Sequence, residues 1–259
     1  MKKTIALFLL LVLAVSLCAC GPKTETIYVQ TRSLRTIAGR EIRSEYTYAS
    51  DGSPLEVKTY YNDVLFQTAS TRTSGGIDYL TVVDAEGNTS TQSTWTTYDD
   101  RGNVTKVEQA VGGNSVSQTT YTYDDRDRML TAVTKTGDGE ATYSYTYDEQ
   151  GNMIEQVKDD KPAKLYTRIV YRYDDRGYVQ EEKSYDQEDV LLSSITYAYE
   201  ADNTGRTATY YDGEGEPTGQ VVTSRYDANG YLIQEITTVD GEVFQTIENT
   251  YEAMEIPVK

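Results

Sequence analysis

The chain contains no histidine and only two cysteines, and both cysteines lie within its first 20 residues. Zinc, copper and haem sites of the usual kind need imidazole or thiolate ligands, so the rest of the chain lacks the residues to build them. Catalysis by Ser-His-Asp or Cys-His groups is excluded for the same reason. We therefore expect a protein that uses no cofactor.

Long hydrophobic runs are confined to the N-terminus. Two lysines precede an apolar stretch from Ile5 to Leu17, which is too short for a permanent membrane span and is typical of a secretory signal. The stretch ends in Leu-Cys-Ala-Cys20-Gly, which resembles the bacterial lipobox. The resemblance implies cleavage just before Cys20 and attachment of a diacylglyceryl group to that residue. An ordinary cleaved signal, with Cys20 incidental, is the alternative.

This N-terminus leads to a division of the chain into three parts. We expect a cleaved signal peptide over residues 1–19, a lipidated tether over 20–26 and a repeat domain over 27–259. Acyl chains buried in a bilayer contribute about 0.8 kcal/mol per CH₂. The lipid would therefore hold the protein on the extracytoplasmic side of a bacterial membrane, at the cell surface or in the periplasm.

Positive charge is scarce. Without the two lysines of the leader, 22 basic residues stand against 41 acidic ones, a net charge of −19. A surface this acidic repels phosphate backbones, so we expect no nucleic-acid partner. The 24 tyrosines argue against disorder, because disordered chains are poor in aromatic residues.

A Tyr-x-Tyr-Asp pattern returns about every 25 residues after the leader. A fixed period of this length indicates one supersecondary unit stacked many times. Tyr48 marks an earlier copy, residues 70–76 look like a decayed copy, and residues 27–48 are expected to form a capping hairpin. The second tyrosine of the later copies falls at Tyr98, Tyr123, Tyr147, Tyr173, Tyr199, Tyr226 and Tyr251.

One unit, read from Tyr98, contains two strands and two tight turns. Residues 99–103 form a polar turn, residues 104–111 a strand, residues 112–114 a second turn, and residues 115–123 a strand rich in Thr and Tyr. No later window has a sustained 3.6-residue apolar period, so we expect essentially no helix. We predict an all-β fold of about nine hairpin units in one antiparallel sheet, elongated, twisted, curved and partly open.

Residues 145–153 read Tyr-Thr-Tyr-Asp-Glu-Gln-Gly-Asn-Met, and close copies begin at Tyr121, Tyr171 and Tyr226. This pattern resembles the YD repeat of the Rhs (rearrangement hot spot) family over roughly residues 40–259. The resemblance implies long antiparallel sheets that spiral, and in large toxins of the family they form a hollow shell around a cargo. With about nine units this chain has far fewer than such a shell needs, so only the repeat fold is implied.

Residues i and i+2 of a strand share a face, so the two tyrosines of each pattern point the same way. The resulting rows either form a ladder that holds the sheet together, which we favour, or offer a ligand-binding face. The tyrosines of that candidate face are Tyr121, Tyr123, Tyr145, Tyr147, Tyr171, Tyr173, Tyr197 and Tyr199. Trp95 is expected on the opposite face, as a core plug or, alternatively, as an exposed stacking residue.

Paired aspartates open several turns and could line one edge of the sheet. Calcium prefers six to eight oxygen ligands, and carboxylates of adjacent turns are a weak candidate for them. The alternative is that these carboxylates serve only as solvated turn residues, and we expect no firm metal site. The six candidates are Asp99, Asp100, Asp124, Asp125, Asp174 and Asp175.

These features predict a surface-anchored, non-catalytic β-repeat lipoprotein with a binding or scaffolding role in the cell envelope. Its partner would be an unidentified envelope protein or polysaccharide. The alternative is a carbohydrate-binding lipoprotein that uses exposed Tyr, Asp and Asn along the sheet. A glycosidase-like enzyme is a weaker hypothesis, because a shallow repetitive sheet offers no obvious pocket that excludes water.

Overall fold

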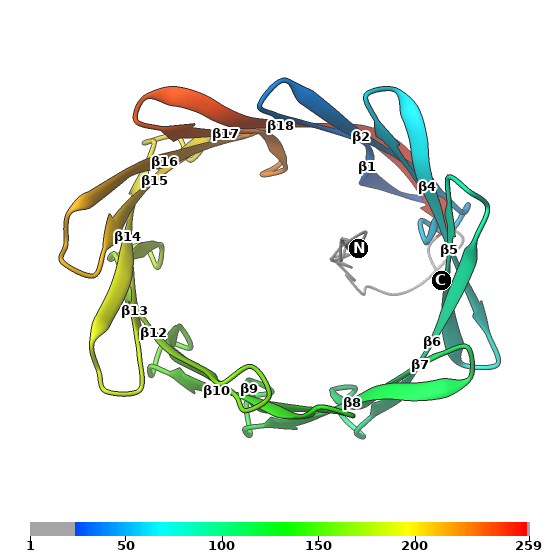
Figure 1. Ribbon diagram of the computed structural model, residues 1–259, viewed down its shortest axis with the longest axis horizontal. Coiled ribbons are helices and arrows are strands. Elements are labelled where there is room, and N and C mark those ends of the chain that lie inside the picture. Colours follow the sequence, from blue (N-terminus) through cyan, green and yellow to red (C-terminus); the bar gives the residue numbers. More distant parts are fainter. Residues whose placement is uncertain (1–23, 258–259) are drawn as a thin grey trace.

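A computed structural model of the protein describes residues 24–257 and shows one antiparallel sheet of 18 strands. β1 (Thr24–Ile37) pairs with β2 (Arg40–Tyr48) on one side and with β18 (Glu242–Pro257) on the other. The sheet therefore closes on itself as a barrel (Figure 1). The other strands, in chain order, are β3 (Pro54–Tyr61), β4 (Val64–Ser74), β5 (Ile77–Asp84), β6 (Thr89–Tyr98), β7 (Val104–Val111), β8 (Asn114–Tyr123), β9 (Met129–Thr136), β10 (Gly139–Tyr147), β11 (Met153–Asp160), β12 (Leu165–Tyr173), β13 (Val179–Tyr185), β14 (Leu191–Tyr199), β15 (Gly205–Asp212), β16 (Pro217–Tyr226) and β17 (Leu232–Val239).

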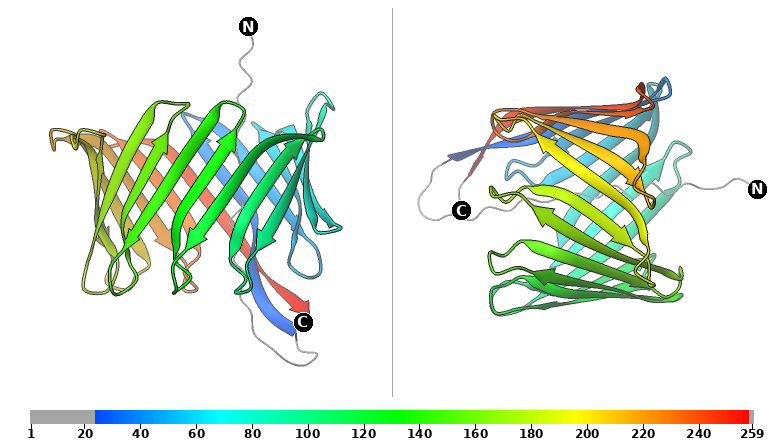
Figure 2. Two further views of the ribbon diagram at one scale, coloured as in Figure 1. Left: turned by 90° about the horizontal axis from the view of Figure 1, so that it is seen from below. Right: turned by 90° about the vertical axis from the view of Figure 1, so that its left-hand side faces the viewer.

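The closed ring corrects the prediction of a partly open sheet, whereas the all-β hairpin array is confirmed. An open array would leave the backbone N–H and C=O groups along the outer edges of β1 and β18 unpaired. Pairing β1 with β18 satisfies these groups along the seam. The strands are inclined to the ring axis (Figure 2), as closure of a sheet requires.

The structure matches the predictions made from the sequence at several places. β7 and β8 match the two strands expected in the unit that starts at Tyr98. β1 and β2 form the expected hairpin around Ala38 and Gly39, but it does not cap the sheet, because β1 also pairs with β18. Residues 24–26, expected in the tether, are the start of β1, whereas the signal peptide and Cys20 lie outside the described residues. Throughout residues 24–257 no helix is long and apolar enough to cross a membrane.

The ring has two distinct ends because the strands alternate in direction. Thr24 and Pro257 lie at one end, called here the proximal end, together with the turns that follow even-numbered strands. The turns that follow odd-numbered strands lie at the other, distal end. β1 and β18 are the longest strands, and their paired ends project beyond the proximal rim as a two-stranded ribbon (Figure 2).

The wall is a single layer, so its best-shielded residues lie within the sheet. With strands about 4.8 Å apart and tilted by about 40°, a ring of this many strands has a backbone radius of about 18 Å. Side chains of the wall cannot fill such a ring, and a side chain is shielded mainly by its neighbours on the same face. Ala132 and Ala208, which are 7% and 3% exposed, sit opposite tyrosines of adjacent strands.

Candidate functional site

Each repeat begins with a turn that an aspartate organises. The Oδ1 atom of Asp99 accepts the backbone N–H groups of Arg101 at 2.9 Å and Asn103 at 2.8 Å. Asp124, Asp174 and Asp227 accept the N–H groups two and four residues later in the same way. The repeated aspartate is therefore the residue that closes the turn.

These hydrogen bonds favour the ionised carboxylate. A bond from the side chain of Asn152, together with backbone N–H donors, lowers the pKa of Asp148. The pKa of Asp174 is lowered chiefly by the backbone N–H of Tyr178. The turns also need one residue with positive φ, which Gly102 supplies at φ 90° and Asp127 supplies at φ 61°.

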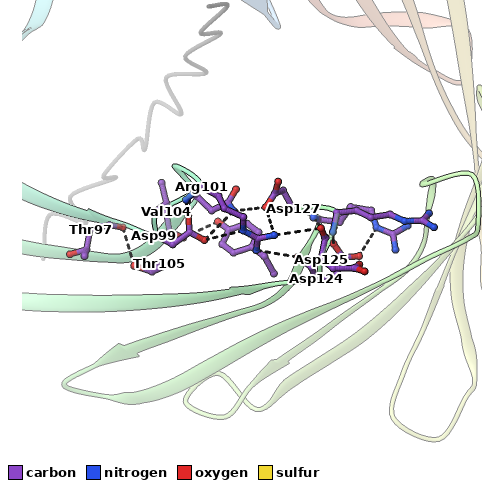
Figure 3. A network of polar contacts seen from close by, with 12 residues as sticks. Thr97, Asp99, Arg101, Val104, Thr105, Asp124, Asp125 and Asp127 are labelled. Atoms are coloured by element: carbon purple, nitrogen blue, oxygen red, sulfur yellow. Dashed lines mark hydrogen bonds and ion pairs between the residues drawn. The ribbon is translucent and has the colours of Figure 1, made fainter.

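Side chains join three successive turns at the proximal rim, and Figure 3 shows the contacts between the first two. Arg101 forms an ion pair with Asp127 at 2.9 Å and donates to the backbone carbonyl of Asp124 at 3.3 Å. Arg128 forms an ion pair with Asp124 at 2.7 Å and donates to the carbonyl of Asp148 at 3.1 Å. Neighbouring repeats are thus linked through their turns as well as through the strands.

The second tyrosine of the pattern links one repeat to the preceding one. The Tyr123 hydroxyl donates to the carbonyl of Val104 at 2.8 Å, and the Tyr147 hydroxyl donates to that of Met129 at 2.8 Å. In each case the acceptor is the first residue of a strand. The same bond recurs from Tyr48 to Gln30, from Tyr173 to Met153 and from Tyr199 to Val179, although Gln30 lies within its strand. Four of the eight predicted face tyrosines, Tyr123, Tyr147, Tyr173 and Tyr199, therefore have a structural partner for their hydroxyl.

The first tyrosines of the pattern differ in this respect. Tyr121, Tyr145 and Tyr171 are half-buried, and their hydroxyls have no hydrogen-bond partner among residues 24–257. Burial raises the pKa of Tyr145, with further contributions from neighbouring tyrosines that include Tyr121. Burial, with the charge of Glu182, raises the pKa of Tyr171 to about 12. These three tyrosines form a row of hydroxyls with spare hydrogen-bonding capacity.

The row continues into a charged cluster that the sequence did not reveal. The Tyr197 hydroxyl donates to Glu182 at 2.6 Å, and burial together with this carboxylate raises the pKa of Tyr197. The Arg206 guanidinium lies 5.1 Å from the centre of the Tyr197 ring. Glu182 and Arg206 could have been found only with the strand register, which places Glu182 opposite Tyr171 and Arg206 opposite Tyr199.

The structure does not gather the six aspartates proposed for calcium. Among residues 24–257, no group of three or more acidic, histidine or cysteine side chains is placed to hold a metal ion. Asp99, Asp124 and Asp174 each direct an oxygen at the N–H groups of their own turn. Turn formation accounts for these three carboxylates.

Trp95 is not a plug. Its side chain is 38% exposed, and its neighbours in the register are Ile77 and Glu108. As predicted, Trp95 lies on the opposite face of β6 from Tyr98, three residues away. A single-layer wall has no second layer for a large ring to fill, which explains the exposure.

Two hollows of the wall lie away from the predicted tyrosine face. One, of about 560 Å³, lies at the proximal end and is lined by residues that include Arg225, Gln234 and Glu248. The other, of about 370 Å³, is apolar and lies at the distal end beside Phe66. None of the eight predicted face tyrosines lines either hollow.

Comparison with protein families identifies the repeat. Residues 98–141 match the family described as RHS Repeat. This segment is similar to an RHS repeat. It contains the two turns joined by Arg101 and the Tyr123 hydrogen bond, and the resemblance predicted from the tyrosine pattern is thereby confirmed. Within this matched segment Asp99 and Asp124 organise the turns, and Tyr123 bonds to the first residue of β7.

Some solved structures show a distant similarity to this chain. A porin-like protein from Bacteroides uniformis is 14% identical, with 86% of this chain and 98% of that chain covered and a TM-score of 0.45. A chain of the Photorhabdus luminescens Tc holotoxin pore is 13% identical, with 81% of this chain but 14% of that chain covered and a TM-score of 0.38. A porin-like protein from Bacteroides vulgatus is 12% identical, with coverages of 86% and 98% and a TM-score of 0.35. No sequence among curated proteins matches this chain.

Proposed function

We propose that the protein is a surface-anchored, non-catalytic β-repeat lipoprotein that binds or scaffolds another macromolecule of the bacterial envelope. The observation that carries the proposal is the use of the repeated polar residues. The aspartates close turns and the second tyrosines bond to carbonyls of the preceding repeat, so the repeated Asp and Tyr side chains serve to build the wall. A rigid ring of this kind suits presentation of a surface better than chemistry on a substrate.

The lipobox around Cys20 supports a location outside the cytoplasm. The first strand of the described residues begins at Thr24, so a lipid on Cys20 would sit only four residues from the end of the ribbon that projects from the proximal rim. Four extended residues span at most about 14 Å. The proximal rim would then face the membrane and the distal rim would face away from it.

The anchor is tested by expressing the full chain in a bacterium that is fed an alkyne-labelled fatty acid. The wild-type protein should carry the label and sediment with membranes, whereas Cys20→Ala should be unlabelled and remain in the soluble fraction. Cys18→Ala is the matched control and should keep both label and membrane. Labelling of Cys20→Ala at the wild-type level would refute the anchor.

A carbohydrate ligand is a second candidate, favoured by the row of Tyr121, Tyr145 and Tyr171. Their hydroxyls have no partner among the described residues, and aromatic rings next to acidic groups are suited to sugar hydroxyls and sugar faces. Glu182 supplies an acceptor beside the end of the row.

This candidate is tested on arrays of glycans and envelope polysaccharides with the full chain carrying Cys20→Ala. Replacing Tyr121, Tyr145 and Tyr171 together by Phe keeps the rings and removes the hydroxyls, and it should abolish saturable binding. A matched variant with Tyr28→Phe and Tyr98→Phe should bind as before, because both residues lie outside the row. Equal binding by the two variants would exclude the row as the sugar site.

A further inference from the structure

Exposed apolar residues recur at one structural position of the distal hairpins. In β3–β4 the register passes from Thr59 opposite Gln67 to Tyr60 opposite Leu65, so Phe66 is the extra residue of a β-bulge. Phe244 has the same position in β17–β18. Val116 and Leu192 are the extra residues of β7–β8 and β13–β14. The exposed fractions are 51% for Phe66, 52% for Phe244, 42% for Val116 and 46% for Leu192.

Phe66 and Phe244 differ from the other two because their hairpins flank the same neighbour. The β1–β2 tip lies between β17–β18 and β3–β4 in the ring (Figure 1). Ala38 donates its backbone N–H to the carbonyl of Phe244 at 3.4 Å, and Glu41 and Asn62 exchange two hydrogen bonds of 2.9 Å. The three tips are therefore joined side by side across the seam at which the ring closes.

The joined tips carry a concentration of apolar side chains. Val64 and Leu65 are 69% and 41% exposed next to Phe66, and Val243 is 65% exposed next to Phe244. An apolar hollow of about 370 Å³ lies between Phe66 and Ala85 of the next tip, and Tyr61, Val64 and Leu65 also line it. We call these three joined tips, with the adjoining β5–β6 turn, the seam patch. Exposed apolar groups gathered in this way mark interaction sites.

The charges around the seam patch indicate what it can bind. Its turns carry six acidic residues against one basic residue, Arg40, and Arg43 of β2 forms an ion pair at 3.3 Å with one of the six, Asp63. The acidic residues are Glu41, Asp63, Asp84, Glu86, Asp240 and Glu242. An apolar centre with an acidic rim is complementary to a segment that combines apolar residues with lysine or arginine. The same rim opposes anionic lipid and a second copy of this acidic chain.

We propose that the seam patch is the docking surface for a basic amphipathic segment of another protein, with Phe66 and Phe244 as its two anchors. The proposal rests on the binding role proposed above but not on the lipid anchor. It places the docking surface at the distal rim, the end farthest from Thr24.

The test uses the full chain with Cys20→Ala and a synthetic 18-residue helical peptide of leucine and lysine, with binding measured by fluorescence anisotropy. Saturable binding is expected, and Phe66→Ser with Phe244→Ser should weaken it at least about tenfold, the effect of removing aromatic anchors. Val116→Ser with Leu192→Ser is the matched control, because these bulge residues have similar exposure at other tips. It should change the affinity less than about twofold. Circular dichroism shows whether both variants keep the strand content.

Charge is tested separately with Glu86→Gln and Glu242→Gln, which should weaken binding of the lysine peptide and reduce its salt dependence. A peptide in which glutamate replaces lysine should not bind. Equal losses in the two serine variants, or equal binding of the glutamate peptide, would overturn the proposal. Two other outcomes would also overturn it. Binding to phosphatidylcholine vesicles that depends on Phe66 and Phe244 would assign the patch to lipid. Self-association in sedimentation that depends on the same two residues would assign the patch to a second copy of the chain. Peptide binding by a chain that fails the fatty-acid test would support the patch while refuting the anchor.

Discussion

Replacing Tyr147 by Phe isolates the hydrogen bond that links one repeat to the preceding one. The change removes the hydroxyl that donates to the Met129 carbonyl at 2.8 Å and leaves the ring in place. A typical intramolecular hydrogen bond contributes about 0.5–1.5 kcal/mol to the free energy of unfolding. Tyr147→Phe should therefore destabilise the protein by about 1 kcal/mol.

The matched control is Tyr145→Phe, two residues away on the same strand. Its hydroxyl has no hydrogen-bond partner among residues 24–257, and its ring packs in the same row. Its removal should change the free energy of unfolding by less than about 0.5 kcal/mol. The difference between the two variants is then the value of the hydrogen bond.

Combining four such changes enlarges the effect. Tyr123, Tyr147, Tyr173 and Tyr199 lie about two strands apart, close to the distance beyond which effects add. Their simultaneous replacement by Phe should cost about 2–6 kcal/mol, a large share of the about 5–15 kcal/mol that is typical of a folded domain. Triple replacement of Tyr121, Tyr145 and Tyr171 by Phe should cost little.

The assay is urea unfolding followed by circular dichroism, with the slope of the transition checked for each variant. Backbone hydrogen exchange near residue 129 gives a local readout, because a weakened link should open there first. If Tyr145→Phe costs as much as Tyr147→Phe, packing of the rings holds the repeats together and the reasoning from the hydroxyl is wrong.

Three further predictions concern pH and the turns. Folding lowers the pKa of Asp148, so the Asp148 carboxylate stabilises the fold at pH values above the ordinary carboxyl pKa. This stabilisation is lost as the pH falls through the lowered pKa. Asp148→Asn should therefore lower the urea midpoint more at pH 7 than at pH 2. Burial raises the pKa of Tyr171 to about 12, so the protonated tyrosine stabilises the fold below about pH 10 and this contribution is lost between about pH 10 and 12. An absorbance titration at alkaline pH should show one fewer late-ionising tyrosine in Tyr171→Phe than in the wild type. An unchanged titration would contradict this prediction. Gly151 has φ 98° with open space around it, so Gly151→Ala should lower the free energy of unfolding by about 1–2 kcal/mol through backbone strain alone. Gly137 also has open space but no positive φ, so Gly137→Ala should leave thermal unfolding nearly unchanged.

The local structure of this protein follows from short-range chemistry that is visible in the sequence. The spacing of Tyr98 and Tyr123 shows the repeat length, and the Asp and Gly residues after each tyrosine show the turn. Residues 104–111 and 115–123 were predicted as strands because apolar and Thr-rich runs lie between those turns, and β7 and β8 confirm them. The common face of Tyr121 and Tyr123 is a consequence of the two-residue period of any strand.

The candidate site was predictable only in part, because side-chain partners depend on register. The tyrosine rows were visible, but the difference between Tyr145, which has no hydroxyl partner among residues 24–257, and Tyr147, which bonds to Met129, was not. Glu182 lies opposite Tyr171 because of a pairing between β12 and β13 that no local pattern specifies. Trp95 was placed on the correct face, yet its exposure depends on the wall being one layer thick.

The repeat, the hairpins, the turn residues and the two faces of each strand can be predicted from the sequence, since all of these depend on neighbours within about 25 residues. Closure of the sheet is visible only in the folded molecule. Closure joins Thr24–Ile37 to Glu242–Pro257, more than 200 residues apart, and it depends on the summed tilt and twist of every strand between them. The seam patch also depends on this closure, because Phe66 and Phe244 flank the same β1–β2 tip only when β1 pairs with β18.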